Sequence, residues 1–175
     1  MSQAQAKEFT IKEKDLHPHE TILFKSLCSK LKETRILTLE NCKLTKFDPK
    51  TLPYKVKQIC LSTNKLTEIS QIVFDHELDG AYNLKGVQLL SIDLSCNKLT
   101  KFPIEALKYQ SQLRKIDLRR NNISNLDENL SLTKFKRLKL LDLSSNRISE
   151  FPMQVTQLAS LQILRLIFNK IKTIP

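Results

Sequence analysis

A short pattern of apolar residues recurs along this chain and constrains its fold more than any other feature. In LKLLDLSSNRISEF, residues 138–151, apolar residues occupy positions 138, 141, 143, 148 and 151, and Asn146 follows the most apolar part. The pattern occurs five more times, and the six copies align on Cys42, Asn64, Asn97, Asn121, Asn146 and Asn169. Chance does not place so many apolar residues on one template, so the sequence predicts a repeat architecture.

Each copy predicts one strand and one turn. Alternate residues of a strand point to opposite sides, so Leu141 and Leu143 should face inward while Asp142 and Ser144 face outward. One unit cannot bury its leucines alone, whereas stacked units bury them and pair strand with strand. The turn leaves inward backbone groups without partners, and an Asn amide both donates and accepts. The Asn positions therefore predict a structural ladder, with Cys42 replacing Asn in the first copy.

The copies resemble the leucine-rich-repeat family over roughly residues 34–175. The proline after the last apolar position, at Pro103, Pro152 and Pro175, resembles the short intracellular class with repeats of about 23 residues. The resemblance implies an α/β solenoid with a concave parallel β-sheet and with short helices or extended segments on the convex side. It also implies a non-catalytic platform that binds proteins.

Three segments are predicted. Residues 1–19 are polar and charge-mixed, which favours a flexible or draped arm. Residues 20–33 place apolar side chains at offsets of three and four, which predicts an amphipathic helix that caps the first coil. A partner-binding or membrane-surface helix is the alternative. Residues 34–175 form the predicted solenoid of six repeats.

One repeat is longer than the others. The turn residues Asn64 and Asn97 are 33 positions apart, while the other spacings are 22 to 25. The surplus lies in Ser70 to Gly86, which carries both glycines of the chain. This insertion predicts either a contact with a partner or a longer convex helix that simply packs.

Composition indicates the cellular compartment of the protein and the kinds of chemical site that it lacks. The four cysteines form no CxxC pair, which favours reduced thiols in an intracellular protein. The sequence has no signal-like or membrane-spanning apolar run, so we expect a cytoplasmic protein, with the nucleus as the alternative, and no membrane partner. Two glycines cannot build a phosphate-binding loop, and the three histidines lack further metal ligands nearby. We therefore predict no catalytic, cofactor or metal site.

The predicted partner-binding surface combines mixed charge with apolar side chains. Alternation places a row of aspartates and nearby arginines on the concave face, and exposed apolar residues at the C-terminal end. The predicted residues are Asp93, Asp117, Arg119, Arg120, Leu140, Asp142, Ile163, Arg165, Ile167 and Phe168. A mixed-charge surface suits a protein better than a uniform phosphate track. We expect a protein partner to cover the C-terminal end; a longer repeat array or a frayed last coil are the alternatives.

A basic rim is the second predicted surface. The positions directly after the turn residues are Lys43, Lys65, Lys98, Arg147 and Lys170, interrupted by Asn122. The net charge of +11 favours acidic partners without selecting among them. This rim therefore predicts either a solvated edge or contact with RNA, a ribonucleoprotein or an acidic cytoskeletal surface. No aromatic residue interleaves with these charges, which argues against base stacking there.

Overall fold

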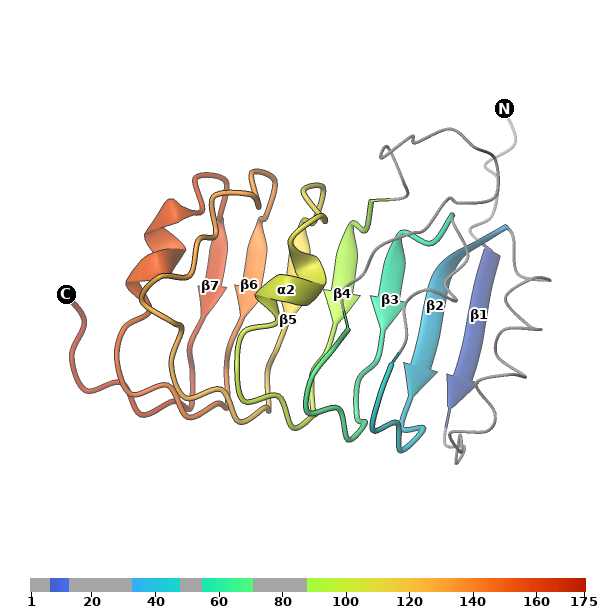
Figure 1. Ribbon diagram of the computed structural model, residues 1–175, viewed down its shortest axis with the longest axis horizontal. Coiled ribbons are helices and arrows are strands. Elements are labelled where there is room, and N and C mark those ends of the chain that lie inside the picture. The colour runs from blue at the N-terminus through green and yellow to red at the C-terminus, as the bar shows by residue number, and fades with distance from the viewer. Residues whose placement is uncertain (1–6, 13–32, 48–54, 71–87) are drawn as a thin grey trace.

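The structure, a computed structural model, describes residues 7–12, 33–47, 55–70 and 88–175 (Figure 1). These residues form one parallel sheet of seven strands in sequence order. The strands are β1 (Lys7–Lys12), β2 (Thr34–Glu40), β3 (Gln58–Cys60), β4 (Ser91–Asp93), β5 (Lys115–Asp117), β6 (Leu140–Asp142) and β7 (Ile163–Arg165). Because every strand pairs with its sequence neighbour in parallel, the chain returns to the same sheet edge after each strand, which makes a solenoid.

The register is the same at every junction from β3 to β7. Ile59, Ile92, Ile116, Leu141 and Leu164 are paired from strand to strand. The first four of these side chains are buried in one continuous core, as the alternation predicted. The predicted solenoid with its parallel sheet is confirmed.

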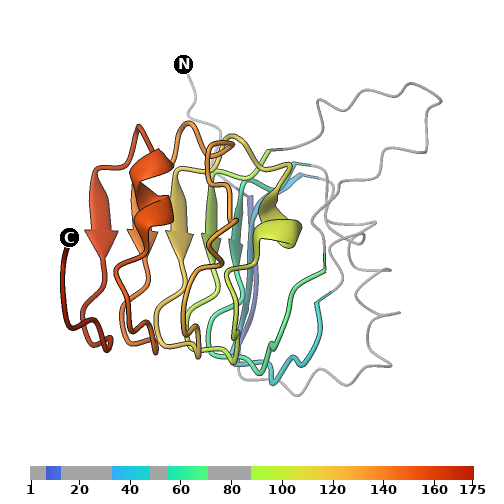
Figure 2. The same ribbon diagram turned by 60° about the vertical axis from the view of Figure 1, so that its left-hand side comes forward.

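Two short helices lie on one side of the sheet. Helix α2 (Ile104–Leu107) and the 3₁₀ helix η3 (Met153–Gln157) each begin directly after a proline, Pro103 and Pro152. Figures 1 and 2 show both on the same side, and we call the opposite side the open face. The rings of Phe102 and Phe135, both buried in the core, meet edge to face with centroids 6.4 Å apart.

An Asn ladder joins each coil to the one before it. The Asn97 Oδ1 atom accepts the backbone N–H of Leu66 at 3.0 Å, and its Nδ2 atom donates to the carbonyl of Leu61 at 2.9 Å. The same pair of bonds recurs at Asn64, Asn121, Asn146 and Asn169. Each Asn therefore satisfies one donor and one acceptor of the preceding coil.

The N-terminal segment differs from its prediction at residues 7–12, which form strand β1 rather than a flexible arm. Phe9 and Ile11 pair with Leu37 and Leu39 and pack against the core. Lys12 contributes an ion pair of 2.8 Å to Glu40, and this bond lowers the pKa of that carboxyl. Phe9 and Ile11 alternate with polar residues, which is a strand pattern. The segment is too short and too charged for this pattern to be distinctive in the sequence.

Two further predictions lie outside the described residues. The capping helix at 20–33 falls almost wholly on residues 13–32, and the Ser70–Gly86 insertion falls on 71–87. Both stay predictions.

Replacing Asn97 by Ala should destabilise the solenoid. The substitution leaves the buried N–H of Leu66 without an acceptor and removes one partner from three carbonyls. An unsatisfied buried donor costs about 1–3 kcal/mol, and we expect a loss of about 2 kcal/mol or more in the free energy of unfolding measured in urea.

The matched control is Asn122→Ala, where the side chain is half-buried and makes no side-chain hydrogen bond to the described residues. This control should stay within about 0.5 kcal/mol of the original protein. Equal losses in the two variants would contradict a structural role for the ladder.

Candidate protein-binding face

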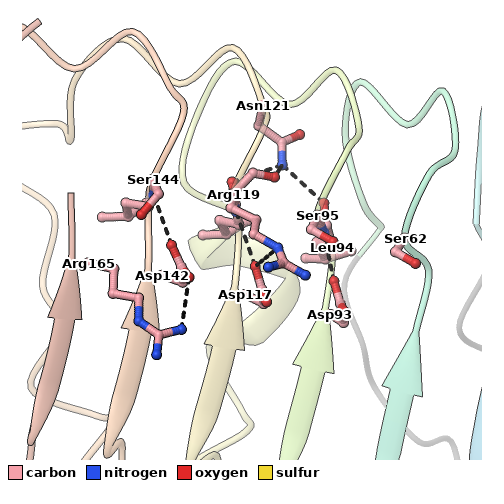
Figure 3. Close-up of polar contacts among 12 residues, drawn as sticks. Ser62, Asp93, Leu94, Ser95, Asp117, Arg119, Asn121, Asp142, Ser144 and Arg165 are labelled. Carbon is pink, nitrogen blue, oxygen red and sulfur yellow. Dashed lines mark hydrogen bonds and ion pairs between the residues drawn. The ribbon is translucent and has the colours of Figure 1, made fainter. Parts of the chain in front are cut away.

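The open face carries one row of charged residues across four strands. Asp93, Asp117, Asp142 and Arg165 are register partners on β4, β5, β6 and β7. Figure 3 shows these side chains side by side on the same face. Adjacent strands are about 4.8 Å apart, so the three carboxyl groups are close neighbours.

The aspartates are less exposed than the alternation suggested. The side chains of Asp117 and Asp142 are only 5% and 4% exposed, because each folds back onto its own strand end. Asp142 Oδ1 accepts the backbone N–H of Ser144 at 3.0 Å, and Asp93 Oδ1 accepts that of Ser95 at 2.9 Å. These carboxylates therefore cap the turn that follows each strand, which is a structural function.

Burial and like charge perturb Asp117 in particular. Desolvation raises the pKa of its carboxyl, and the neighbouring Asp93 and Asp142 charges raise it further. The backbone N–H and the charge of Arg119 act in the opposite direction. The centre of the row thus holds a carboxylate whose negative charge is costly and only partly compensated.

Basic side chains border the row and leave a mixed-charge surface. Arg119 Nε lies 3.6 Å from Asp117 Oδ1, and Arg165 Nη1 lies 3.4 Å from Asp142 Oδ2. Lys115, which was not among the predicted site residues, also approaches Asp117, at 3.9 Å. Its place beside the Asp row was visible in the sequence from the strand register alone. The structure brings the predicted charges together, while their contact with a partner stays a prediction.

The apolar residues predicted at the C-terminal end lie on the last two described coils, at the two ends of β7. Ile163 is on the open face beside Leu140, its register partner on β6. Ile163, Ile167 and Phe168 are 43%, 61% and 81% exposed, while Leu140 is half-buried. We call these four residues the apolar end.

Phe168 is the most unusual member of the apolar end. The residue before the ladder position has a positive φ in every coil, from Asn41 and Thr63 to Ser145 and Phe168. Left-handed backbone is an outlier for a bulky residue. The equivalent positions carry Asn, Thr, Cys, Arg and Ser, so the turn does not require an exposed aromatic ring here.

The residues of the predicted basic rim lie in one row, which Asn122 interrupts. Main-chain hydrogen bonds run from Lys65 N to Leu44 O, from Lys98 N to Leu66 O and from Arg147 N to Ile123 O, which repeats one register. Lys43 begins this row, and Lys43, Lys65, Lys98, Arg147 and Lys170 are all exposed. Arg120 is exposed at the same end of the strands, and it lies in the turn just before Asn121 rather than in a strand.

Comparisons with known proteins agree with this architecture. The leucine-rich-repeat family profile matches residues 87–148. A solved structure, the Leptospira interrogans LRR protein LIC12759, is 28% identical and superimposes with a TM-score of 0.66 over 83% of this chain and 34% of its own. This chain is a leucine-rich-repeat protein. Proteins of this fold are commonly protein-interaction modules and are generally non-catalytic.

Curated relatives of this leucine-rich-repeat protein are much longer than the match. Chicken (Gallus gallus) lumican is 35% identical over 79% of this chain and 38% of its own length. The volume-regulated anion channel subunit LRRC8A of Homo sapiens is 30% identical over 83% of this chain and 17% of its own. The murine leucine-rich repeat serine/threonine-protein kinase 1 is 29% identical over 77% of this chain and 7% of its own. The similarity therefore covers less than two-fifths of each relative.

The described residues contain neither a membrane-spanning helix nor a cluster of metal ligands. Their helices are all too short to cross a bilayer. No group of three or more His, Cys, Asp or Glu side chains in the described ranges is arranged to hold a metal ion.

Asp117→Asn should change how stability depends on pH. A raised carboxyl pKa in the folded state means that folding favours the protonated form, so ionisation above about pH 4 costs stability. The amide of the variant would keep an acceptor for the Arg119 N–H without the charge. We therefore expect the original protein to lose stability relative to D117N as the pH rises from about 3 to 7 in urea unfolding series.

Glu105→Gln is a control of opposite sign. The bond to Lys108 lowers the pKa of the Glu105 carboxyl, so its stabilising contribution is present above the ordinary carboxyl pKa and is lost in acid. The original protein should gain relative to E105Q over the same range. A gain relative to D117N as well would contradict the assignment of Asp117 as a destabilising charge.

Proposed function

We propose that this protein is a non-catalytic adaptor that binds a protein partner through the charged row of the open face and the apolar end. The observation that carries the proposal is the exposure of Ile163, Ile167 and Phe168 on one coil, with Leu140 beside Ile163. Exposed apolar side chains gathered near charged residues are typical of an interface.

The neighbouring charges support a protein rather than a uniform polyanion as the occupant of this face. Acidic and basic groups alternate across it, from Asp117 with Arg119 to Asp142 with Arg165. A protein surface with its own charge pattern can match such a row and gain orientation from it. A phosphate backbone would be repelled by the carboxylates of Asp93 and Asp117.

The exposed edge of β7 offers main-chain groups to the same partner. At the previous junction Leu143 N donates to Arg165 O, and Ser145 N donates to Ile167 O, at 2.9 and 2.7 Å. The equivalent donors on the last described coil are the N–H groups of Leu166 and Phe168, which have no acceptor among the described residues. A partner that lays a strand along β7 can accept both bonds and cover the apolar end.

We place this activity in the cytoplasm or the nucleus. Cys60 and Cys96 form no disulfide with another described residue. Thiols without a disulfide support a reducing compartment, because disulfides form and persist in oxidising ones.

The proposal predicts that Ile167→Ser with Phe168→Ser abolishes partner binding. Both side chains are exposed, so the folded state should tolerate the change while the partner loses its apolar anchor. The matched control is Tyr109→Ser with Met153→Ser, which removes two exposed apolar side chains, 55% and 53% exposed, outside the apolar end.

The measurement is affinity capture from native extract, with nuclease treatment, followed by mass spectrometry and by direct binding of the partner. We expect nuclease-resistant proteins that the original chain and the Y109S/M153S control retain and the I167S/F168S variant loses. Retention of the same partners by all three proteins would remove the apolar end from the proposal.

A further inference from the structure

A second charged surface lies on the edge of the sheet where the strands begin, the upper edge in Figure 1. Main-chain hydrogen bonds run from Lys57 N to Arg35 O, from Arg114 N to Leu90 O and from Lys139 N to Arg114 O. Successive residues of this row are therefore one strand spacing apart, about 4.8 Å. The row lies opposite the basic rim, which follows the other end of the strands.

Four cations of this edge lie on two neighbouring coils. Leu113 N donates to Gln110 O and Leu138 N donates to Phe135 O, so the two coils repeat the same turn before their strands. That equivalence places Lys136 and Arg137 next to the turn that precedes Arg114. We call Arg114, Lys136, Arg137 and Lys139 the basic edge.

The basic edge has no acidic partner among the described residues. All four side chains are exposed, and none forms a salt bridge within that part of the chain. The sequence contains no Asp or Glu between Glu128 and Asp142. On the opposite rim, by contrast, Glu68 and Glu150 lie within a few residues of the lysines and arginines.

An exposed aromatic ring lies at the same level. Tyr109 directly precedes Gln110, and its equivalent on the next coil is Lys134. The ring is 55% exposed, and the Lys108 ammonium group lies 5.4 Å from its centroid. A basic row with an exposed aromatic ring beside it is the arrangement that binds single-stranded nucleic acid, in which bases stack while phosphates follow the charges.

A protein partner fits this edge less well. Stable protein interfaces need buried apolar anchors, and the described exposed large hydrophobic residues beside the basic edge are Tyr109 and, next to Lys139, Ile163 of the apolar end. Exposed ion pairs with carboxylates each contribute little to affinity. A phosphate polymer instead gains affinity by releasing the counterions condensed along it, and this gain needs no apolar anchor.

We propose that the basic edge binds the sugar–phosphate backbone of a single-stranded nucleic acid and that Tyr109 stacks on one of its bases. The basic edge meets the apolar end at Lys139, which precedes Leu140 and whose carbonyl accepts the N–H of Ile163. The variants below change no residue of the apolar end, so they test nucleic-acid binding alone, and the proposal goes beyond the protein-binding function.

The test uses the full chain and fluorescent mixed-sequence RNA and DNA single strands of about 16 nucleotides, with binding followed by anisotropy. The variant is R114Q/K136Q/R137Q/K139Q. Its matched control is K65Q/K98Q/R147Q/K170Q, which removes the same charge from the opposite rim. Between about 50 and 200 mM salt, each phosphate that the variant no longer neutralises should reduce the slope of log K against log salt by about 0.7, so the variant should bind at least 10-fold more weakly at low salt.

Tyr109→Ala should weaken binding roughly five-fold or more and leave the salt slope unchanged, because it removes stacking and no charge. The Q variants keep exposed polar side chains, and circular dichroism verifies their fold. Equal loss of affinity in both quadruple variants would overturn the proposal in favour of non-specific attraction. The proposal would be overturned in favour of an acidic protein segment if the chain binds neither oligonucleotide but binds polyglutamate, and if the R114Q/K136Q/R137Q/K139Q variant loses that binding.

Discussion

The bond between an Asn side chain and the backbone of the preceding coil is the interaction on which the rest of this structure depends. Each turn ends with main-chain groups that its own coil cannot satisfy. At the four junctions from Leu66 to Asn169 the following coil supplies both the acceptor and the donor, at 2.9 to 3.0 Å. The coils are therefore stable as neighbours rather than alone, and strand register, leucine burial and the rows on both faces follow from their stacking.

The stacking of the coils explains why the residues of the two proposed binding surfaces differ from the residues that hold the fold together. Residues that point inward are fixed by stacking, and the aspartates of the open face are partly fixed by the turns that they cap. Exposed side chains are constrained neither by stacking nor by the capping of a turn. Phe168, Ile167 and the four cations of the basic edge satisfy no group of the described fold, and the solenoid would form without them.

Much of the fold could be predicted from the sequence because the repeat is a spacing rule. The positions of Leu141, Leu143 and Asn146 within one copy determine a strand face and a turn, and six copies determine the sheet. Strand β1 could not be predicted in this way, since Phe9 and Ile11 belong to no copy of the repeat and their segment is short; in the structure it pairs with β2. The burial of Asp117 and Asp142 could not be predicted from the sequence either. Strand alternation predicts the side of the sheet to which a side chain points, but not the hydrogen bond that folds the carboxylate onto the turn.

Native-state hydrogen exchange of individual amides is the most direct test of the central claim that each coil is completed by the next one. Leu66, Leu99, Ile123 and Ile148 each donate their N–H to the Asn of the following coil. The equivalent donor on the last described coil is Ile171, which has no such acceptor among the described residues. The account predicts strong protection at Leu99 and Ile123 and fast exchange at Ile171. Equal protection of Ile171 and Ile123 would contradict it.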